Sequence, residues 1–367
     1  APACSAHNSR KSSRRCRAAS RCETFCRLMD RYHIFNEIGA GRQSQVFKGR
    51  TKKTTNYVAI KRVEKESMDK VVNEVAMMHS LSHPHTLKFY DWYETRNNLW
   101  LILEYCSGGD LKSLLKMDKQ LPAPAVKLLA GDLLAGLQYL HYSGILYCDL
   151  KPSNVLIDEH GVLKLAGFGL ARRVPTDANR AKAPKNRGTP YFMAPELFLR
   201  DGVHNFGSDL WSLACVCYEL ATGKPPFASA TLNDLMDRIA TASPDFSEEL
   251  FLEGDPSQQP HGKSNGGLLR ASFARRRRWS GAHPCRTADF VEALRAFFRK
   301  DATQRPTWAE IRESFWGDVV PPPPADRDLP PQPLFEATVA KARHAQQPPA
   351  APDQPSSRLN DDDDDDD

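Results

Sequence analysis

The 367-residue sequence contains no apolar run long enough to cross a bilayer, since segments such as Leu99–Leu103 are far too short. It has no internal repeat with a period of about 20 to 50 residues, which argues against solenoid and propeller folds. Nine cysteines are scattered along the chain, and the five in its central part, Cys106, Cys148, Cys215, Cys217 and Cys285, show neither a paired metal-ligand spacing nor a disulfide framework. We therefore predict a cytoplasmic protein with free thiols and no membrane partner.

Basic residues outnumber acidic residues once one short acidic run is set aside. The formal net charge is +5, but Asp361–Asp367 contribute seven negative charges, so the rest of the chain carries about +12. A basic surface attracts acidic partners, such as phosphorylated protein, the acidic face of tubulin polymers or nucleic acid. Because no nucleic-acid-binding motif accompanies the charge, we expect a solvated basic surface and no specific nucleic-acid partner.

Three compositionally biased zones flank or interrupt the rest of the chain. Residues 1–28 are rich in Arg and Ser, residues 243–285 in Ser, Gly, Pro and Arg, and residues 318–367 in Pro and Asp. Such segments bury too little apolar surface to fold alone. We interpret them as a disordered basic extension, a surface insertion and a disordered tail, with an organelle transit peptide as the alternative for the first.

The region between these zones, residues 29–317, has the periodicity of one two-lobed domain. Residues 32–106 alternate short apolar runs with polar turns around one helical stretch. Residues 107–317 are mostly helical patterns, broken by a strand-rich centre at 145–170. We predict an α+β fold with a small β-rich N-lobe and a larger helical C-lobe.

Several ordered motifs in this domain resemble the eukaryotic protein kinase superfamily over about residues 32–316. They are Gly39-Ala-Gly41, Val58-Ala59-Ile60-Lys61, Tyr147-Cys148-Asp149-Leu150-Lys151-Pro152-Ser153-Asn154, Gly167-Phe168-Gly169, Gly188-Thr189-Pro190-Tyr191 and Ala194-Pro195-Glu196. The form Lys151-Pro152-Ser153-Asn154 is typical of serine/threonine kinases. The resemblance implies a bilobal kinase fold that binds ATP and acts on, or associates with, other proteins.

Within the superfamily, the chain is similar to the Fused and fourth Unc-51-like kinase group, the RUNKEL-like proteins. The segments that carry this similarity are Tyr90-Asp91-Trp92-Tyr93-Glu94-Thr95, Glu104-Tyr105-Cys106, Gly144-Ile145-Leu146-Tyr147 and Leu329-Pro330-Pro331-Gln332-Pro333. Members of this group carry a long C-terminal helical-repeat region and associate with microtubules in cytokinesis or cilia. The resemblance therefore implies an N-terminal kinase-domain portion with a cytoskeletal connection.

The resemblance also assigns residues to an ATP site. Glycines let backbone N–H groups approach phosphates closely, and Lys61 would contact the phosphates while Glu74 holds it by an ion pair. Taken alone, these two residues fit an exposed surface lysine and a solvated helical glutamate better, and the flanking motifs favour the ion pair. The residues predicted to bind the nucleotide are Gly39, Gly41, Val46, Ala59, Lys61, Glu74, Leu103, Glu104, Cys106 and Leu156.

The catalytic loop carries the three residue types that phosphoryl transfer requires. Asp149 would accept the substrate hydroxyl proton, Lys151 would steady the transferred phosphate, and Asn154 would bind a metal. Two further residues are predicted to be structural. Asp209 would brace the catalytic loop, and Arg305 would pair with Glu196 in the C-lobe.

The sequence lacks a carboxylate where the resemblance places one, because Gly167 replaces the Asp that holds Mg²⁺. Asn154 remains as a weak metal ligand, and its neutral amide replaces none of the missing charge. Losing about 3–4 kcal/mol of transition-state stabilisation slows transfer by roughly 10²–10³. We expect ATP binding for which Mg²⁺ is weak or dispensable.

Three functions stay open from the sequence. The first is a pseudokinase scaffold that uses ATP for its shape and is linked to microtubules. The second is a slow or unconventional serine/threonine kinase. The third is a structural domain with a dead pocket. Regulation is also expected to differ, since Cys148 replaces the Arg that usually pairs with an activation-segment phosphate.

Overall fold

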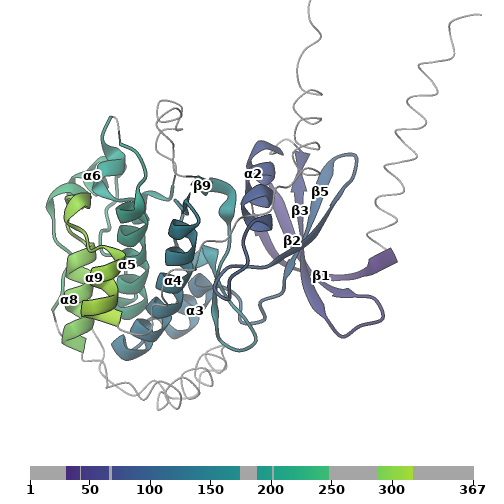
Figure 1. Cartoon of the computed structure of the whole chain (residues 1–367), viewed down its shortest axis with the longest axis horizontal. Helices are drawn as coiled ribbons and strands as arrows, with labels where there is room; N and C mark the ends of the chain where they lie inside the picture. The colour runs from purple at the N-terminus through teal and green to yellow at the C-terminus, as the bar shows by residue number, and fades with distance from the viewer. Residues whose placement is uncertain are drawn as a thin grey trace, which may run out of the picture. The chain divides into compact units, whose positions relative to one another are not determined.

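The computed structural model describes residues 30–41, 43–65, 68–173, 188–200, 202–247 and 287–316 (Figure 1). The predicted extension, most of the insertion and the tail lie outside the described residues. The strands are β1 (Tyr32–Gly41), β2 (Ser44–Thr51), β3 (Tyr57–Glu64), β4 (Phe89–Glu94), β5 (Asn98–Glu104), β6 (Ile145–Leu146), β7 (Val155–Ile157), β8 (Leu163–Leu165) and β9 (Arg172–Arg173). The α-helices are α2 (Met68–His79), α3 (Leu111–Asp118), α4 (Ala123–Tyr142), α5 (Phe206–Thr222), α6 (Leu232–Thr241), α8 (Thr287–Phe297) and α9 (Trp308–Glu310).

The N-lobe is built on an antiparallel sheet in the order β1-β2-β3-β5-β4. Because side chains alternate along a strand, each strand presents one set to each face. One face forms a core from Tyr32, Val58, Ile60, Tyr93, Trp100 and Ile102. The opposite face presents Ala59 and Lys61 of β3, and the register places Val46 of β2 directly across from Lys61.

Helix α2 lies beside this sheet (Figure 1). Val71, Val75 and Met78 are buried at helical spacing, together with the charged Glu74 on the same side. A glutamate on the buried side of an amphipathic helix needs a charged partner. The sequence of α2 therefore directs its carboxylate toward the sheet.

The C-lobe is organised around two helices, α4 and α5, which lie side by side with α8 next to α5 (Figure 1). Both are buried on most sides, as their apolar sequences indicate. Asn205 caps α5 through the Ser208 N–H, and Gly223 ends it at a φ of 72°. Two short antiparallel pairs, β6 with β9 and β7 with β8, carry the catalytic loop and the Gly167 segment.

This arrangement confirms the predicted two-lobed α+β fold. The part of the chain that the structure describes contains no helix that combines the length and apolarity of a membrane span.

Candidate active site

An ion pair joins α2 to the sheet. Lys61 Nζ lies 2.7 Å from Glu74 Oε1 and 2.8 Å from Oε2. The side chains are 21% and 9% exposed, so neither is the solvated surface group that the sequence alone allowed. Burial of both partners in bonding geometry strengthens their attraction and fixes α2 against β3.

The predicted adenine-binding residues lie around the end of β5. Leu103 is buried and pairs across the sheet with Ala59. The segment after Glu104 returns to β7, where Asp110 bridges to Leu156 and the Gly108 N–H donates to the Ile157 carbonyl at 2.9 Å. The sheet and β7 are thereby held together at the connection between the lobes.

Glu104 and Cys106 occupy this connection. The Glu104 carboxylate accepts from Lys164 Nζ at 2.9 Å and from the Lys88 N–H at 3.0 Å. Burial, reinforced by Glu104, raises the pKa of the Cys106 thiol to about 12. The thiol is therefore protonated, and Cys106 contributes to this site through its backbone and its apolar bulk.

At the glycine-rich turn, Gly39 pairs with Val46 and Gly41 with Ser44. The backbone of both strands comes close here because the two glycines lack side chains. Val46 lies across from Lys61, so the turn and the lysine share one face of the sheet.

The catalytic loop folds around the Asp149 carboxylate. Its Oδ2 accepts from Lys151 Nζ at 2.6 Å and from Asn154 Nδ2 at 2.8 Å. Thr189 Oγ1 donates to Oδ1 at 3.2 Å and accepts from Lys151 Nζ at 2.9 Å. The structure therefore brings the three predicted catalytic residues together and adds Thr189, which sequence reasoning did not place on this carboxylate.

Asp209 braces this loop as predicted. Its carboxylate accepts the backbone N–H groups of Tyr147 and Cys148 and faces His141 Nε2, each at 2.9 Å. Cys148 has a φ of 65°, a left-handed conformation that costs a non-glycine residue about 1–2 kcal/mol. The two N–H bonds to Asp209 hold the backbone in that conformation. Burial also raises the pKa of the Cys148 thiol to about 12, so it carries no charge there.

The predicted pair of Arg305 and Glu196 is confirmed. The guanidinium binds the carboxylate through two bonds of 2.7 and 2.8 Å, and Arg305 is only 5% exposed. A bidentate, buried pair of this kind is geometrically specific. It fixes the end of the segment that begins at Gly188 against the C-lobe.

Gly167 adopts the left-handed conformation, with φ 70° and ψ 47°. A Cβ at this position would lie 2.9 Å from both Cγ and Oδ1 of Asn154. The Asn154 amide thus fills the room that a side chain at 167 needs. It also directs Nδ2 to the Asp149 carboxylate and backbone carbonyl, both at 2.8 Å.

The Gly167 and Asn154 positions offer few ligands to Mg²⁺. The metal requires oxygen ligands, usually with one or two carboxylates among them. Gly167 supplies none, and the Asn154 amide donates its hydrogens to Asp149, so only its neutral Oδ1 is left to face a metal. Residues 30–316, in their described parts, contain no group of three or more His, Cys, Asp or Glu side chains that could hold a metal ion.

The segment after Gly167 is held from both lobes. Phe168 is fully buried, and its ring meets that of Tyr147 edge-on at a centroid distance of 5.4 Å. The Tyr147 hydroxyl donates to the Ala166 carbonyl. From α2, Asn73 Nδ2 donates to the Ala171 carbonyl at 2.8 Å. Sequence reasoning gave Asn73 no role.

A cavity of about 410 Å³ opens beside the catalytic loop. Glu219 Oε2, on α5, is buried and has no hydrogen-bond partner among the described residues. Burial raises the Glu219 pKa above its ordinary value, and Lys112 offsets part of that effect. Sequence reasoning missed this site, although a lone glutamate in the apolar run of α5 was a signal. The cavity is lined by Lys112, Lys151, Pro152, Ser153, Thr189, Tyr191, Phe192, Glu219 and Pro225.

Comparison with known proteins finds protein kinases. Residues 32–317 match the protein kinase domain family. Serine/threonine-protein kinase RUNKEL of Arabidopsis thaliana is 42% identical over 309 residues, which cover 84% of this chain and 20% of that protein. Serine/threonine-protein kinase ULK4 of Mus musculus is 32% identical over 314 residues, covering 80% and 22%. Serine/threonine-protein kinase 36 of Pongo abelii is 35% identical over 249 residues, covering 63% and 18%. The chain thus spans about a fifth of the length of these relatives.

Proposed function

The chain belongs to the protein kinase family, and from that premise we propose that it is a pseudokinase scaffold of the RUNKEL-like group. In this function ATP binds between the lobes and stabilises their arrangement without being consumed. The observation that carries the proposal is Gly167, whose missing carboxylate is replaced in space by the neutral amide of Asn154. The intact pair of Lys61 and Glu74 supports retained nucleotide binding.

In this function, the residues of the site act either on the nucleotide or on the catalytic loop. Lys61 supplies a fixed positive charge for the phosphates, and the residues at the end of β5 enclose the base. Asp149 is occupied by Lys151, Asn154 and Thr189, so the loop is ordered in the absence of a metal. A ligand that binds only the folded state at a hundred times its Kd adds about 2.7 kcal/mol of stability.

The test is a thermal-shift titration with ATP, in Mg²⁺ and in EDTA. We expect a similar rise in Tm under both conditions, and a smaller rise for Lys61→Met. Lys65→Met is the matched control, because Lys65 pairs with Glu94 instead. A rise that requires Mg²⁺ contradicts the proposal. No response to ATP under either condition favours the dead-pocket alternative.

The second candidate function is a slow or unconventional serine/threonine kinase. It is favoured by the preserved geometry of Asp149 and Lys151, and by the open cavity beside them. Radiolabel transfer from ATP to generic protein substrates distinguishes the two functions. Robust transfer that Asp149→Asn abolishes would establish the kinase and remove the pseudokinase.

The cellular role is proposed from the group alone. We propose cytoplasmic protein partners on microtubules, because RUNKEL-like proteins associate with these polymers. Co-sedimentation of the chain with polymerised tubulin tests this role. Equal recovery in the supernatant with and without polymer contradicts it for this part of the protein.

A further inference from the structure

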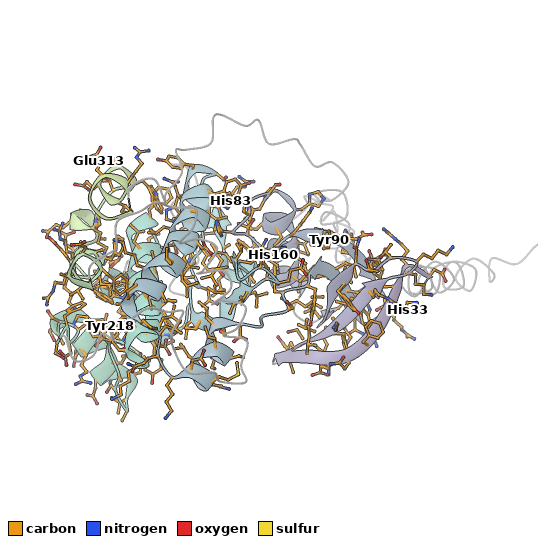
Figure 2. The ribbon with its side chains drawn as sticks, turned by 90° about the horizontal axis from the view of Figure 1, so that it is seen from below. His33, His83, Tyr90, His160, Tyr218 and Glu313 are labelled. Atoms are coloured by element: carbon orange, nitrogen blue, oxygen red, sulfur yellow. The ribbon has the colours of Figure 1, made fainter. Side chains whose placement is uncertain are left out.

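A row of aromatic rings and cations lies on the nucleotide-facing side of the sheet, beyond the lysine. The register pairs His33 with Arg50 and Arg50 with Tyr57, and directly paired residues share a face. Lys48 lies two residues from Arg50 and joins the same face, and Phe35, inside the register shift of β1, joins it through its ring contact with Tyr57. Figure 2 shows His33 on this sheet, on the opposite side of the molecule from Tyr218.

The rings form a continuous row, in which Phe35 and Tyr57 are exposed and Tyr105 is half-buried. The Phe35 and Tyr57 centroids are 6.5 Å apart, and those of Tyr57 and Tyr105 are 6.1 Å apart. Phe35 is 44% exposed and Tyr57 is 47% exposed. Large exposed side chains that adjoin one another, rather than occurring singly, mark an interaction surface.

Lys48 is held in the middle of this row. Its Nζ lies 4.3 Å from the Tyr57 centroid and 5.1 Å from the Tyr105 centroid. A cation over aromatic rings is restrained at little entropic cost, so it is presented to a ligand in a fixed position. Arg50 adds a second cation, and its Nε has no hydrogen-bond partner among the described residues.

Cations outnumber carboxylates around this row. Residues 32–36 and 48–57 contain no Asp or Glu, but they include His33, Lys48, Arg50, Lys52 and Lys53. The next carboxylate along β1, Glu37, accepts a hydrogen bond from Gln45 at 3.0 Å. At the hinge end, Glu104 is paired with Lys164. This surface therefore complements a negatively charged ligand.

We propose that this basic aromatic face, formed by His33, Phe35, Lys48, Arg50, Tyr57 and Tyr105, binds an acidic polypeptide segment of a partner protein. Carboxylates of the segment pair with Lys48 and Arg50, and its aliphatic stems pack against the ring edges. Single-stranded nucleic acid fits less well, because bases stack on open ring faces. Here Lys48 covers the faces of both tyrosines.

The experiment measures binding of a fluorescein-labelled glutamate-rich peptide to the full chain by anisotropy. We expect binding that weakens as salt rises, since exposed charge pairs are screened. Lys48→Glu with Arg50→Glu is expected to weaken it at least tenfold. Tyr57→Thr, which keeps strand propensity, is expected to weaken it about threefold, as the cation loses one ring. Lys65→Met should leave peptide binding unchanged, because the Lys65 side chain pairs with Glu94.

The matched control is Lys116→Glu with Lys224→Glu, which reverses two exposed charges on the C-lobe. An equal loss in this control means that net charge alone binds the peptide, and it overturns the proposal. Binding of single-stranded RNA that is tighter than the peptide and equally sensitive to Lys48→Glu with Arg50→Glu also overturns it. A third result also overturns the proposal. It is that neither the chain nor a variant with Asp361–Asp367 changed to Asn binds the peptide, although the variant lacks the competing acidic run.

Discussion

At the scale of single residues, Gly167 combines two constraints. Its φ of 70° disfavours any side chain, and a Cβ would overlap the Asn154 amide at 2.9 Å. We predict that Gly167→Ala destabilises the fold by about 1–2 kcal/mol, measured by urea unfolding. Adding Asn154→Ala should recover the steric part and leave the backbone part, so that the two effects are not additive.

Gly169, two residues along the chain, provides the control for this prediction. Gly169 has no atom within 4 Å of a Cβ built on it and has no positive φ. Gly169→Ala should therefore leave the unfolding free energy nearly unchanged. Equal destabilisation by both alanines would show that the segment rejects any side chain, independently of Asn154.

The variant Gly167→Asp tests the missing carboxylate, whereas the alanine variants test the backbone and the available space. Aspartate tolerates the left-handed region better than alanine, and it restores the carboxylate that Mg²⁺ requires. We predict that ATP stabilisation becomes Mg²⁺-dependent in this variant and that phosphoryl transfer rises, at some cost in stability from displacing Asn154. Thermal shift and radiolabel transfer, with Gly167→Asn as the uncharged control, measure these effects. A metal response in Gly167→Asn would assign the effect to shape and not to charge.

The environment of His83 is expected to make the stability of the fold depend on pH. Its ring stacks on Tyr139 at 4.6 Å, and burial, with His85 and Lys164 nearby, lowers its pKa to about 4. In the unfolded chain the ring takes up a proton near pH 6.5. The unfolded state therefore binds more protons between about pH 6.5 and 4, and stability falls as pH drops through this window.

The measurement compares urea unfolding at about pH 7 and about pH 4.5. His83→Gln should flatten the decline by on the order of 1 kcal/mol, once the partial exposure of the ring is discounted. The exposed His160, also labelled in Figure 2, provides the control His160→Gln. An unchanged slope in His83→Gln would assign the decline to other groups.

At the scale of elements, the sequence predicted contacts that short spacings determine. Lys61 and Glu74 are thirteen residues apart on a strand and the next helix, and the kinase resemblance paired them, because charge and periodicity alone also fitted two surface groups. The catalytic-loop residues Asp149, Lys151 and Asn154 are also close to one another in the sequence. Asn73 with Ala171, ninety-eight residues apart, and Thr189 with Asp149, forty apart, depend on how the segments meet in space. Spacing carries no information about such contacts, and the distant pair of Arg305 and Glu196 was predicted only because the kinase resemblance supplied it.

Asn73 connects α2 with the segment that follows Phe168. Its single bond to the Ala171 carbonyl adds about 1 kcal/mol, which corresponds to roughly a fivefold change in local opening. We predict that Asn73→Ala speeds amide exchange in residues 168–173 by that factor, while the exposed Asn56→Ala has no effect there. Exchange that rises across the whole N-lobe would mean that Asn73 supports α2 in general, and not this connection.

At the scale of the whole molecule, contacts already present fix the position of α2 and of the Phe168 segment. Lys61 with Glu74 and Asn73 with Ala171 tie α2 to the sheet and to the segment after Gly167, and Phe168 packs on Tyr147. The uncharged Cys148 cannot bind an activation-segment phosphate. Charge added to that segment therefore has no anchor at the Cys148 position, whereas ATP would contact both lobes.

Thr189→Glu makes this argument testable by hydrogen exchange. The Thr189 hydroxyl binds Asp149 and Lys151, so a carboxylate at 189 would face Asp149 and repel it. We predict faster exchange around Asp149 and residues 188–192 in Thr189→Glu, and slower exchange across the lobe connection when ATP is added to the unmodified chain. Thr189→Ser, which keeps the hydroxyl, should behave like the unmodified chain. Protection in Thr189→Glu that matches the effect of ATP would mean that negative charge on this segment does order the domain, and that the lobes respond to phosphorylation after all.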